Sequence, residues 1–309
     1  MGIADLRMRE VARAQTAPVD VCICTFHRPA VVDAVLSAAQ QTPPPARILV
    51  IDNAETPEAA GRVARIQTRT SVPLIYIHAP ARNISVARNA ALEAAAADWL
   101  AFLDDDEIAQ PGWLAALLAQ ARAGACDAVL GPVDAVYPPK TPAWIRELDS
   151  HSTRPVEVGG VIRKGYAGNA MLRRATVARL GLRFDPALGR SGGEDDRFFY
   201  ELTDAGGVIV YAPGALALEP APAARLSLTW LMRRSFRAGQ SHGARLRRLH
   251  GRIGCLVQIA VAAVKVCASA GGAALHVADR PRRNRWLLRL SLHAGAMARL
   301  AGQRELQLY

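Results

Sequence analysis

Four consecutive acids, Asp104-Asp105-Asp106-Glu107, have the clearest chemical potential in this sequence, and they directly follow the apolar run 99–103. In open α/β sheets, a buried strand that delivers polar side chains at its carboxyl end builds a ligand site. Adjacent carboxylates repel one another and need a cation, and the hard oxygens of Asp104 and Asp106 suit Mg2+ or Mn2+ bridging a diphosphate. The alternative is a solvated acidic turn that begins a helix, with Asp106 or Glu107 near the helix N-terminus.

A second group of acids, Glu194-Asp195-Asp196, follows two glycines, Gly192 and Gly193. Flexible glycines in front of acids at a helix N-terminus place carboxylates at a loop–helix junction that faces a cleft. A carboxylate in that position can act as a general base and take a proton from a hydroxyl group. The alternative is an ordinary acidic first turn that the helix dipole stabilises.

Strands and helices alternate along the first half of the chain. Apolar, β-branched runs predict strands, and helices that begin at a proline or a polar residue lie between them. Ser85 is predicted to cap one of these helices. The alternation is typical of an α/β fold with a doubly wound, largely parallel sheet flanked by helices. The strands are predicted at 19–26, 47–51, 73–78, 99–103 and 126–131, and the helices at 29–41, 57–67, 86–97 and 111–124.

The carboxyl ends of parallel strands meet at one edge of a sheet, so Thr25, Asp52 and Asp104 are expected to line a common crevice, with Arg88 projecting from a nearby helix. Asp52 can accept a hydrogen bond from a base or ribose, and Arg88 can hold a phosphate with two parallel bonds. The alternatives are that Asp52 bonds to the backbone of its own turn and that Arg88 is a solvated helix arginine. Neither a Gly-x-Gly-x-x-Gly sequence nor a Walker lysine is present, so a dinucleotide site or a P-loop is unsupported.

Length and composition predict a globular protein. The chain has 309 residues, of which 51% are hydrophobic, enough for one large domain or two modest ones. The five cysteines show neither a paired framework nor metal-ligand spacing, and the alternation of Cys22 and Cys24 in one strand predicts that both face one side and stay reduced in a cytosol. Residues 1–17 are expected to form an extension that is neither a signal peptide nor a transmembrane segment.

The net charge of +11 is unevenly distributed. Residues 225–309 contain sixteen basic and two acidic side chains, a net charge of +14, whereas the preceding 224 residues contain 22 basic and 25 acidic side chains, a net charge of −3. This asymmetry favours an anionic partner, either membrane lipid or nucleic acid. Nucleic acid is not expected, because the basic region lacks aromatic stacking positions and a recognisable reading helix.

Two helices are predicted in the basic region. Residues 225–242 form an amphipathic basic pattern that would either close a donor site or pack on the core. Residues 253–278 are aliphatic or small with basic flanks, but Lys265 would cost a membrane-spanning helix about 2.5–3.5 kcal/mol and Gly271 and Gly272 weaken it further. An interfacial helix that binds anionic lipid is therefore favoured over a span, and a packed core helix is the alternative.

The motifs at 25–29, 83–89, 103–107 and 193–198, together with Asp52, occur in the order found in family 2 glycosyltransferases. The sequence resembles this family over nearly its whole length, and most of all its enzymes of bacterial exopolysaccharide (succinoglycan-type) synthesis. The resemblance implies an inverting enzyme with the GT-A fold, a Rossmann-like, mostly parallel sheet flanked by helices, here with a basic helical C-terminal extension. It also implies a catalytic domain at 18–224, with a nucleotide-binding half at 18–135 and an acceptor half at 136–224, followed by a membrane-associating region at 225–309.

For the donor, the resemblance implies that Thr25 and Asp52 contact the uracil end of a UDP-sugar and that Arg88 contacts its base or diphosphate. Arg28 and Asp105 are assigned to the same nucleotide-sugar site.

For catalysis, the resemblance implies that Asp195 is the catalytic base and that Glu194 supports it or contacts the acceptor. Asp106 would bind Mg2+ or Mn2+, with Asp104 nearer the ribose. Relatives often carry a histidine just before a Glu-Pro pair, and that histidine can complete the metal shell. This chain has Leu218 at that position, before Glu219 and Pro220. Either Glu219 replaces that ligand, or Asp106 holds the metal together with diphosphate and water.

The function that the resemblance implies is transfer of a sugar, glucose in a β-1,4 linkage, from a UDP-sugar to a lipid-linked oligosaccharide. The enzyme would lie peripherally or interfacially at the cytoplasmic face of the bacterial inner membrane, on anionic lipid. Three alternatives are a glycosyltransferase of another cell-surface polysaccharide, a nucleotidyltransferase, and a nucleic-acid-binding protein that acts through the basic region. A nucleotidyltransferase would need a characteristic glycine-rich loop after the first strand, and this sequence lacks that loop.

Overall fold

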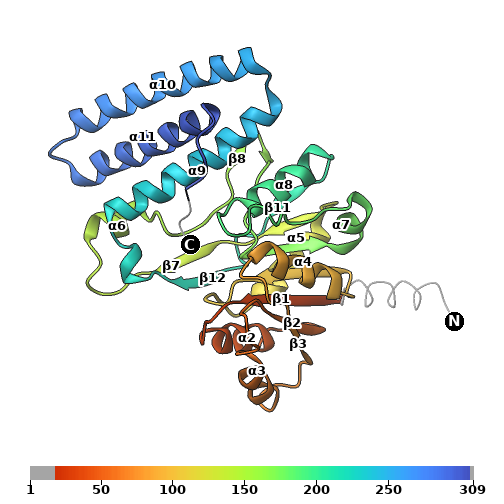
Figure 1. Cartoon of the computed structure of the whole chain (residues 1–309). Helices are drawn as coiled ribbons and strands as arrows, with labels where there is room; N and C mark the ends of the chain where they lie inside the picture. The colour runs from red at the N-terminus through yellow and green to blue at the C-terminus, as the bar shows by residue number, and fades with distance from the viewer. Residues whose placement is uncertain (1–17, 307–309) are drawn as a thin grey trace. The chain divides into compact units, whose positions relative to one another are not determined.

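The computed structural model describes residues 18–306, so the extension predicted at 1–17 lies outside the described residues. The chain divides into two compact units (Figure 1). The first consists of the chain up to Asp134, Thr153–Arg190 and Glu194–Glu219, and the second of Ala135–Ser152, Ser191–Gly193 and the chain from Pro220 onward. The second unit thus includes three segments of the predicted catalytic domain, residues 135–152, 191–193 and 220–224.

A seven-stranded sheet forms the centre of the first unit. Four strands, in the order β4-β1-β2-β3, are parallel, and β10 is inserted antiparallel between β4 and β6. The predicted mostly parallel sheet is therefore confirmed, and β10 is an antiparallel strand within it. The strands are β1 Val19–Thr25, β2 Arg47–Asp52, β3 Leu74–His78, β4 Trp99–Leu103, β6 Ala128–Leu130, β10 Asn169–Arg173 and β11 Ile209–Tyr211.

Helices cover both faces of this sheet, because β1 and β4 are buried along their whole length and send apolar side chains to both sides. Val21 and Ile23 pack in one core cluster, while Cys22 and Cys24 pack in the other. All five cysteines are free, and the expectation that Cys22 and Cys24 face one side is confirmed. The helices of this unit are α2 Val31–Ala39, α3 Ala60–Gln67, α4 Ile84–Ala94, α5 Trp113–Ala123, α7 Arg174–Leu180 and α8 Glu194–Asp204.

Helix α4 begins earlier than predicted, because Asn83 and not Ser85 caps it. The Asn83 side chain accepts hydrogen bonds from the backbone N–H groups of Ser85 and Val86 at 3.1 and 3.4 Å. Ser85 is buried and donates its hydroxyl to the carbonyl oxygen of Asp185 at 2.8 Å. Asparagine and serine are comparable caps, so the tertiary contact of Ser85 decides which of them caps the helix.

Short strands complete the first unit. β5 Ile108–Ala109 follows the acidic run directly and pairs antiparallel with β12 Ala217–Pro220. The alternative that the acidic run begins a helix is therefore wrong, because the next helix, α5, begins at Trp113. β7 Val133–Val136 completes a small sheet with these strands, and β8 Glu157–Val158 pairs with β9 Val161–Ile162.

The second unit is helical, with α11 between α9 and α10 (Figure 1). Glycines allow α9 and α11 to approach closely: a Cβ atom at Gly239 would lie 1.9 Å from the carbonyl oxygen of Leu292, and one at Gly295 would lie 2.0 Å from that of Phe236. The helices predicted at 225–242 and 253–278 are confirmed as α9 and α10, whereas α11 was not predicted. The bounds are α6 Ala143–Leu148, η1 Ala223–Arg225, α9 Leu228–Leu249, α10 Arg252–Leu275 and α11 Arg280–Leu300.

Candidate active site

The ends of β1, β2 and β4 lie at one edge of the sheet, as the strand order predicts. Thr25 is the register partner of Asp52, and Cys22 is the partner of Phe102, two residues before Asp104. All the predicted site residues belong to the first unit.

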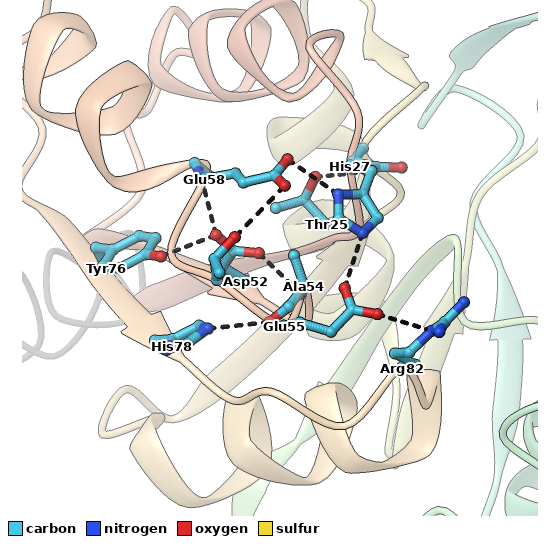
Figure 2. A network of polar contacts seen from close by, with 12 residues as sticks. Thr25, His27, Asp52, Ala54, Glu55, Glu58, Tyr76, His78 and Arg82 are labelled. Atoms are coloured by element: carbon cyan, nitrogen blue, oxygen red, sulfur yellow. Dashed lines mark hydrogen bonds and ion pairs between the residues drawn. The ribbon is translucent and has the colours of Figure 1, made fainter.

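Asp52 is fully engaged with its own surroundings (Figure 2). Its carboxylate accepts hydrogen bonds from the backbone N–H groups of Ala54 and Ala59 at 3.0 and 2.9 Å and from the Tyr76 hydroxyl at 2.8 Å. Burial and then this bond raise the pKa of Tyr76 above its usual value. The structure thus shows the turn-bonding alternative for Asp52, which fixes the loop after β2. Direct contact with a base stays a prediction.

His27 lies beside this loop and was missed by the sequence analysis (Figure 2). Its ring nitrogens lie 2.9 Å from Oε2 of Glu58 and 2.9 Å from Oε2 of Glu55, and Glu55 also pairs with Arg82 Nε at 3.0 Å. The hydrogen bonds to Glu58 and Glu55 raise the pKa of His27. An imidazole between two carboxylates donates from both nitrogens only when it is protonated. The four side chains are surface-exposed, and nothing in the sequence pattern pairs them.

Thr25, Arg28 and Asp105 form one connected group. The Thr25 hydroxyl donates to Asp105 Oδ2 at 2.8 Å, and Arg28 Nη1 donates to Asp105 Oδ1 at 3.0 Å. Arg28 Nη1 also donates to Asp106 Oδ2. Burial raises the pKa of Asp105 to about 6 in spite of the opposing charge of Arg28. The hydroxyl group of Thr25 and the carboxylate of Asp105 are therefore hydrogen-bonded to each other, and Arg28 connects Asp105 to Asp106.

Arg88 connects the two acidic motifs. Its Nη1 atom donates to Glu194 Oε1 at 2.7 Å, and its Nη2 atom donates to Asp104 Oδ1 at 3.4 Å. Its guanidinium carbon lies 5.5 Å from the centroid of the Phe184 ring. Burial alone would lower the pKa of Arg88, but Asp104 and Glu194 outweigh burial and raise it. The alternative of a solvated arginine is wrong, because Arg88 is only 5% exposed.

Glu194 is a buried carboxyl group with an unsatisfied oxygen. Within residues 18–306, its Oε2 atom has no hydrogen-bond partner. Burial, and then the charge of Asp195, raise the pKa of Glu194 to about 7, while Arg88 opposes this shift. Glu194 does lie in the first turn of α8, as the alternative expected, but it is buried rather than solvated. Asp195, which is partly exposed, accepts a bond from the backbone N–H of Asp196 at 2.8 Å.

Glu107 is a second buried acid, and its significance was also missed. Burial, followed by the charges of Asp104, Glu219 and Asp106, raises the pKa of Glu107 well above its usual range. The pairing of Ile108 with Leu218 places Glu219 next to Glu107. A Cβ atom at Gly168 would meet Glu107 Oε1 at 2.6 Å and Asp104 Oδ2 at 2.9 Å, so the two carboxylates converge there.

These carboxylates fit a divalent cation that is completed by other ligands. No set of three or more His, Cys, Asp or Glu side chains between residues 18 and 306 is arranged to hold a metal ion. Negative charge is nevertheless concentrated around Glu107. The hard carboxylate oxygens of Asp104 and Asp106 suit Mg2+ or Mn2+. Mg2+ in particular is usually bound by one or two carboxylates together with phosphate and water. A shell of Asp106 with diphosphate and water, and a shell that Glu219 completes, both stay predictions.

One acidic motif follows β4, the other begins α8, and Arg88 bonds to both. Residues 20–181, slightly more than half of the chain, match glycosyl transferase family 2, so the chain belongs to this family and is a glycosyltransferase. It is 44% identical over 299 residues to the succinoglycan biosynthesis protein ExoM of Rhizobium meliloti (strain 1021), and the match covers 96% of each chain.

Solved structures show the same fold at low sequence identity. The mannosyltransferase PcManGT from Pyrobaculum calidifontis, solved with GDP-Man and Mn2+, has a TM-score of 0.59 at 19% identity, covering 97% of this chain and 95% of its own. TarS 1-349 of S. aureus has a TM-score of 0.54 at 16% identity, covering 77% of this chain, which spans 65% of the TarS fragment. The predicted GT-A fold is confirmed by these likenesses.

Proposed function

We propose that this glycosyltransferase moves a sugar from a UDP-sugar to a lipid-linked oligosaccharide in succinoglycan-type polysaccharide synthesis. The observation that carries the proposal is the double contact of Arg88, which joins Asp104 of the donor-side motif to Glu194 of the acceptor-side motif. The succinoglycan biosynthesis protein that is 44% identical to this chain supports the pathway class. Within that class we assign glucose and a β-1,4 linkage from the resemblance, with another cell-surface polysaccharide as the alternative.

Asp195 removes the proton from an acceptor hydroxyl group. The acceptor oxygen forms a bond to the anomeric carbon as the bond to the UDP oxygen breaks, and the bonding electrons leave with UDP. One displacement inverts the anomeric configuration, so an α-linked donor gives a β-glycoside. A positioned general base typically accelerates such a step by about 10²–10⁴-fold. Glu194, held by Arg88, supports Asp195 or contacts the acceptor.

The donor is bound at the edge formed by β1, β2 and β4. Asp52 and its backbone bonds shape the loop that receives the uracil end, together with Thr25. Arg28 and Asp105 lie between this loop and the acidic run, where the diphosphate is expected. Mg2+ or Mn2+ at Asp106 and Asp104 would stabilise negative charge on the departing diphosphate. PcManGT was solved with GDP-Man and Mn2+, which supports a divalent cation here.

The membrane location rests on α10. Among residues 18–306, α10 is the one helix long and apolar enough to cross a membrane by length and composition. One face of α10 carries exposed apolar side chains. They are Ile253, Leu256, Val257 and Val264, which are 80%, 66%, 54% and 69% exposed. Helices α9, α10 and α11 contain no Asp or Glu. An apolar face beside helices that carry basic but no acidic side chains suits the interface of an anionic bilayer, peripheral to the cytoplasmic face of the inner membrane.

Other occupants of the apolar face fit less well. A second copy of the chain would bring another strongly positive unit against the first, and like charges oppose that association. A membrane span would place Lys265 near the middle of the bilayer. Nucleic acid is not expected, because the exposed face of α10 is apolar rather than charged.

UDP release from UDP-glucose by the purified protein tests the function. We expect release that depends on Mn2+ or Mg2+ and rises when membrane extract supplies acceptor. Asp195→Asn should nearly abolish release while calorimetry shows UDP binding unchanged. Asp33→Asn, an exposed acid in the first turn of α2, is the matched control and should behave like the wild type. Full turnover by Asp195→Asn would overturn the base assignment, and the absence of both UDP binding and UDP release from any UDP-sugar would overturn the function.

A further inference from the structure

The segment Ser191-Gly192-Gly193 leads directly into Glu194 and Asp195 and belongs to the helical unit. Gly192 and Gly193 have φ angles of +84° and +88°, a conformation that favours glycine. A Cβ atom at Gly193 would also lie 2.7 Å from the hydroxyl oxygen of Ser241 on α9. Two adjacent glycines are the most mobile backbone a chain can have, so their fixed path requires anchors.

Arg237 of α9 supplies those anchors. Its Nε atom donates to the carbonyl oxygen of Ser191 at 2.8 Å, and its Nη2 atom donates to the carbonyl oxygen of Gly192. Its Nη1 atom donates to the Ser241 hydroxyl at 2.8 Å. Arg237 is only 5% exposed, so its charge is largely removed from water. The rigid guanidinium fork can hold two consecutive carbonyl groups at once, which a lysine cannot.

The C-terminal segment after α11 completes the arrangement. Glu305 Oε2 lies 2.9 Å from Arg237 Nη2, and Glu305 Oε1 lies 3.3 Å from Arg299 Nε, so one carboxylate offsets part of the charge of both arginines. Gln240, one turn further along α9, donates to the carbonyl oxygen of Arg304 at 3.0 Å and accepts from the N–H of Leu306 at 2.8 Å. Gln240 is 1% exposed, so these are buried bonds that fix the segment carrying Glu305.

We infer that Arg237 and Glu305 form a clasp that positions the chain entering α8, and that Arg237 is thereby a positioning residue for Glu194 and Asp195. The inference rests on the proposed catalytic role of those two carboxylates. Arg237 acts on them through the backbone of residues 191–193, because it holds the carbonyl groups of Ser191 and Gly192. A displacement of about 1 Å at a reacting group can cost about 10²-fold in rate, so a loosened glycine segment is expected to slow transfer.

Kinetics of Arg237 variants test the clasp. Arg237→Ala should lower kcat by about 10–100-fold and leave the Kd of UDP within about twofold, because the proposed donor residues lie outside the segment 191–193 that Arg237 holds. Arg237→Lys keeps the charge but loses the fork, and it should show the same kcat loss. Guanidinium at millimolar concentration should restore part of the kcat of Arg237→Ala but none of that of Asp195→Asn. The control is Arg233→Ala, which removes an exposed arginine one turn earlier on α9.

Hydrogen exchange separates the clasp from the proposed function, because it needs no turnover. In Arg237→Ala and Glu305→Gln, the amides of residues 191–196 should exchange at least about tenfold faster, while β4 and α4 are unchanged. If the wild type turns over no UDP-sugar, the proposed function is overturned, but the exchange measurement still tests whether Arg237 and Glu305 hold residues 191–193. The clasp is overturned if Arg237→Lys has the kcat of Arg233→Ala, or if exchange at 191–196 is unaffected.

Discussion

Arg88 Nη1 lies 2.7 Å from Glu194 Oε1, and both side chains are buried. The two residues are 106 positions apart in the chain. The same guanidinium group donates to Asp104 at 3.4 Å. The positive charge of Arg88 therefore pairs with the acidic motif after β4 and with the acidic motif at the start of α8. A change at either motif therefore alters the electrostatic environment of the other.

Replacing Arg88 with methionine removes the charge and keeps an unbranched apolar side chain. Breaking a buried ion pair costs about 3–5 kcal/mol, and protonation of Glu194 will recover part of that. We expect the free energy of unfolding to fall by at least about 2 kcal/mol. Urea denaturation measures this loss. Arg183→Met is the control, because Arg183 pairs with Glu93 at 3.5 Å on the surface and such pairs contribute about 0–1 kcal/mol. Equal losses in the two variants would contradict the bridging role of Arg88.

Glu194 should make stability depend on pH in a defined direction. Its pKa rises from an ordinary value of 4.5 to about 7 on folding, so the folded state binds this proton more tightly than the unfolded state. The resulting stabilisation is complete below pH 4.5 and is lost as pH rises through 7. Its upper limit is about 3 kcal/mol. The stability difference between the wild type and Glu194→Gln, measured by denaturation at pH 4.5, 6 and 7.5, should therefore shrink as pH rises. A constant difference would show that Glu194 titrates normally.

The sheet could be predicted from the sequence because its signal is local. Strands β1, β2, β3 and β4 are continuous apolar runs, and all four lie within a few residues of their predicted bounds. The antiparallel insertion of β10 could not be predicted, because it depends on pairing with β4 and β6 from a distant part of the chain. Helix α11 was missed because its arginines interrupt the apolar pattern.

The motifs of the site could be found from the sequence, but their contacts could not. The acidic character of Asp104 and Glu194 is visible in the sequence, whereas the bond from Arg88 to both depends on the fold. Likewise, the clasp between Arg237 and Glu305 joins residues 68 positions apart. The burial of Glu107 depends on β12, which pairs with the strand directly after it.

Binding of a divalent metal ion together with UDP should depend on Asp106 more than on Glu219. Asp106→Asn removes a carboxylate that would face the diphosphate, and we expect Mn2+-dependent UDP affinity to fall by at least about tenfold. Glu219→Gln should change that affinity by less than about threefold, because diphosphate and water supply the remaining ligands. Calorimetric titration of UDP with and without Mn2+ measures both. A larger loss in Glu219→Gln would indicate that Glu219 completes the metal shell.

His27 should remain protonated to a higher pH than an isolated histidine. Glu58 and Glu55 lie 2.9 Å from its two nitrogens and favour the imidazolium form, so its pKa is raised from 6.5. As pH rises through that higher pKa, the ring loses a proton and one of its two bonds to carboxylate. NMR titration of the imidazole should show the raised pKa, and Glu58→Gln and Glu55→Gln should each lower it. Glu93→Gln, a distant surface change, should not.

Membrane binding should depend on the apolar face of α10. Moving a valine side chain from water into lipid is worth about 1.5 kcal/mol, so Val264→Asp should reduce binding by at least about tenfold. Val158→Asp is the matched control, because both valines are 69% exposed and Val158 lies in β8 of the first unit.

The measurement is co-sedimentation with vesicles that contain phosphatidylglycerol. We expect the wild type and Val158→Asp to pellet and Val264→Asp to remain in solution. Binding of the wild type should weaken at high salt and on neutral phosphatidylcholine, because the basic helices contribute about 1 kcal/mol for each arginine or lysine near an anionic surface. If both variants pelleted equally, or if neutral vesicles bound as well as anionic ones, the helical unit would not be the lipid-binding surface.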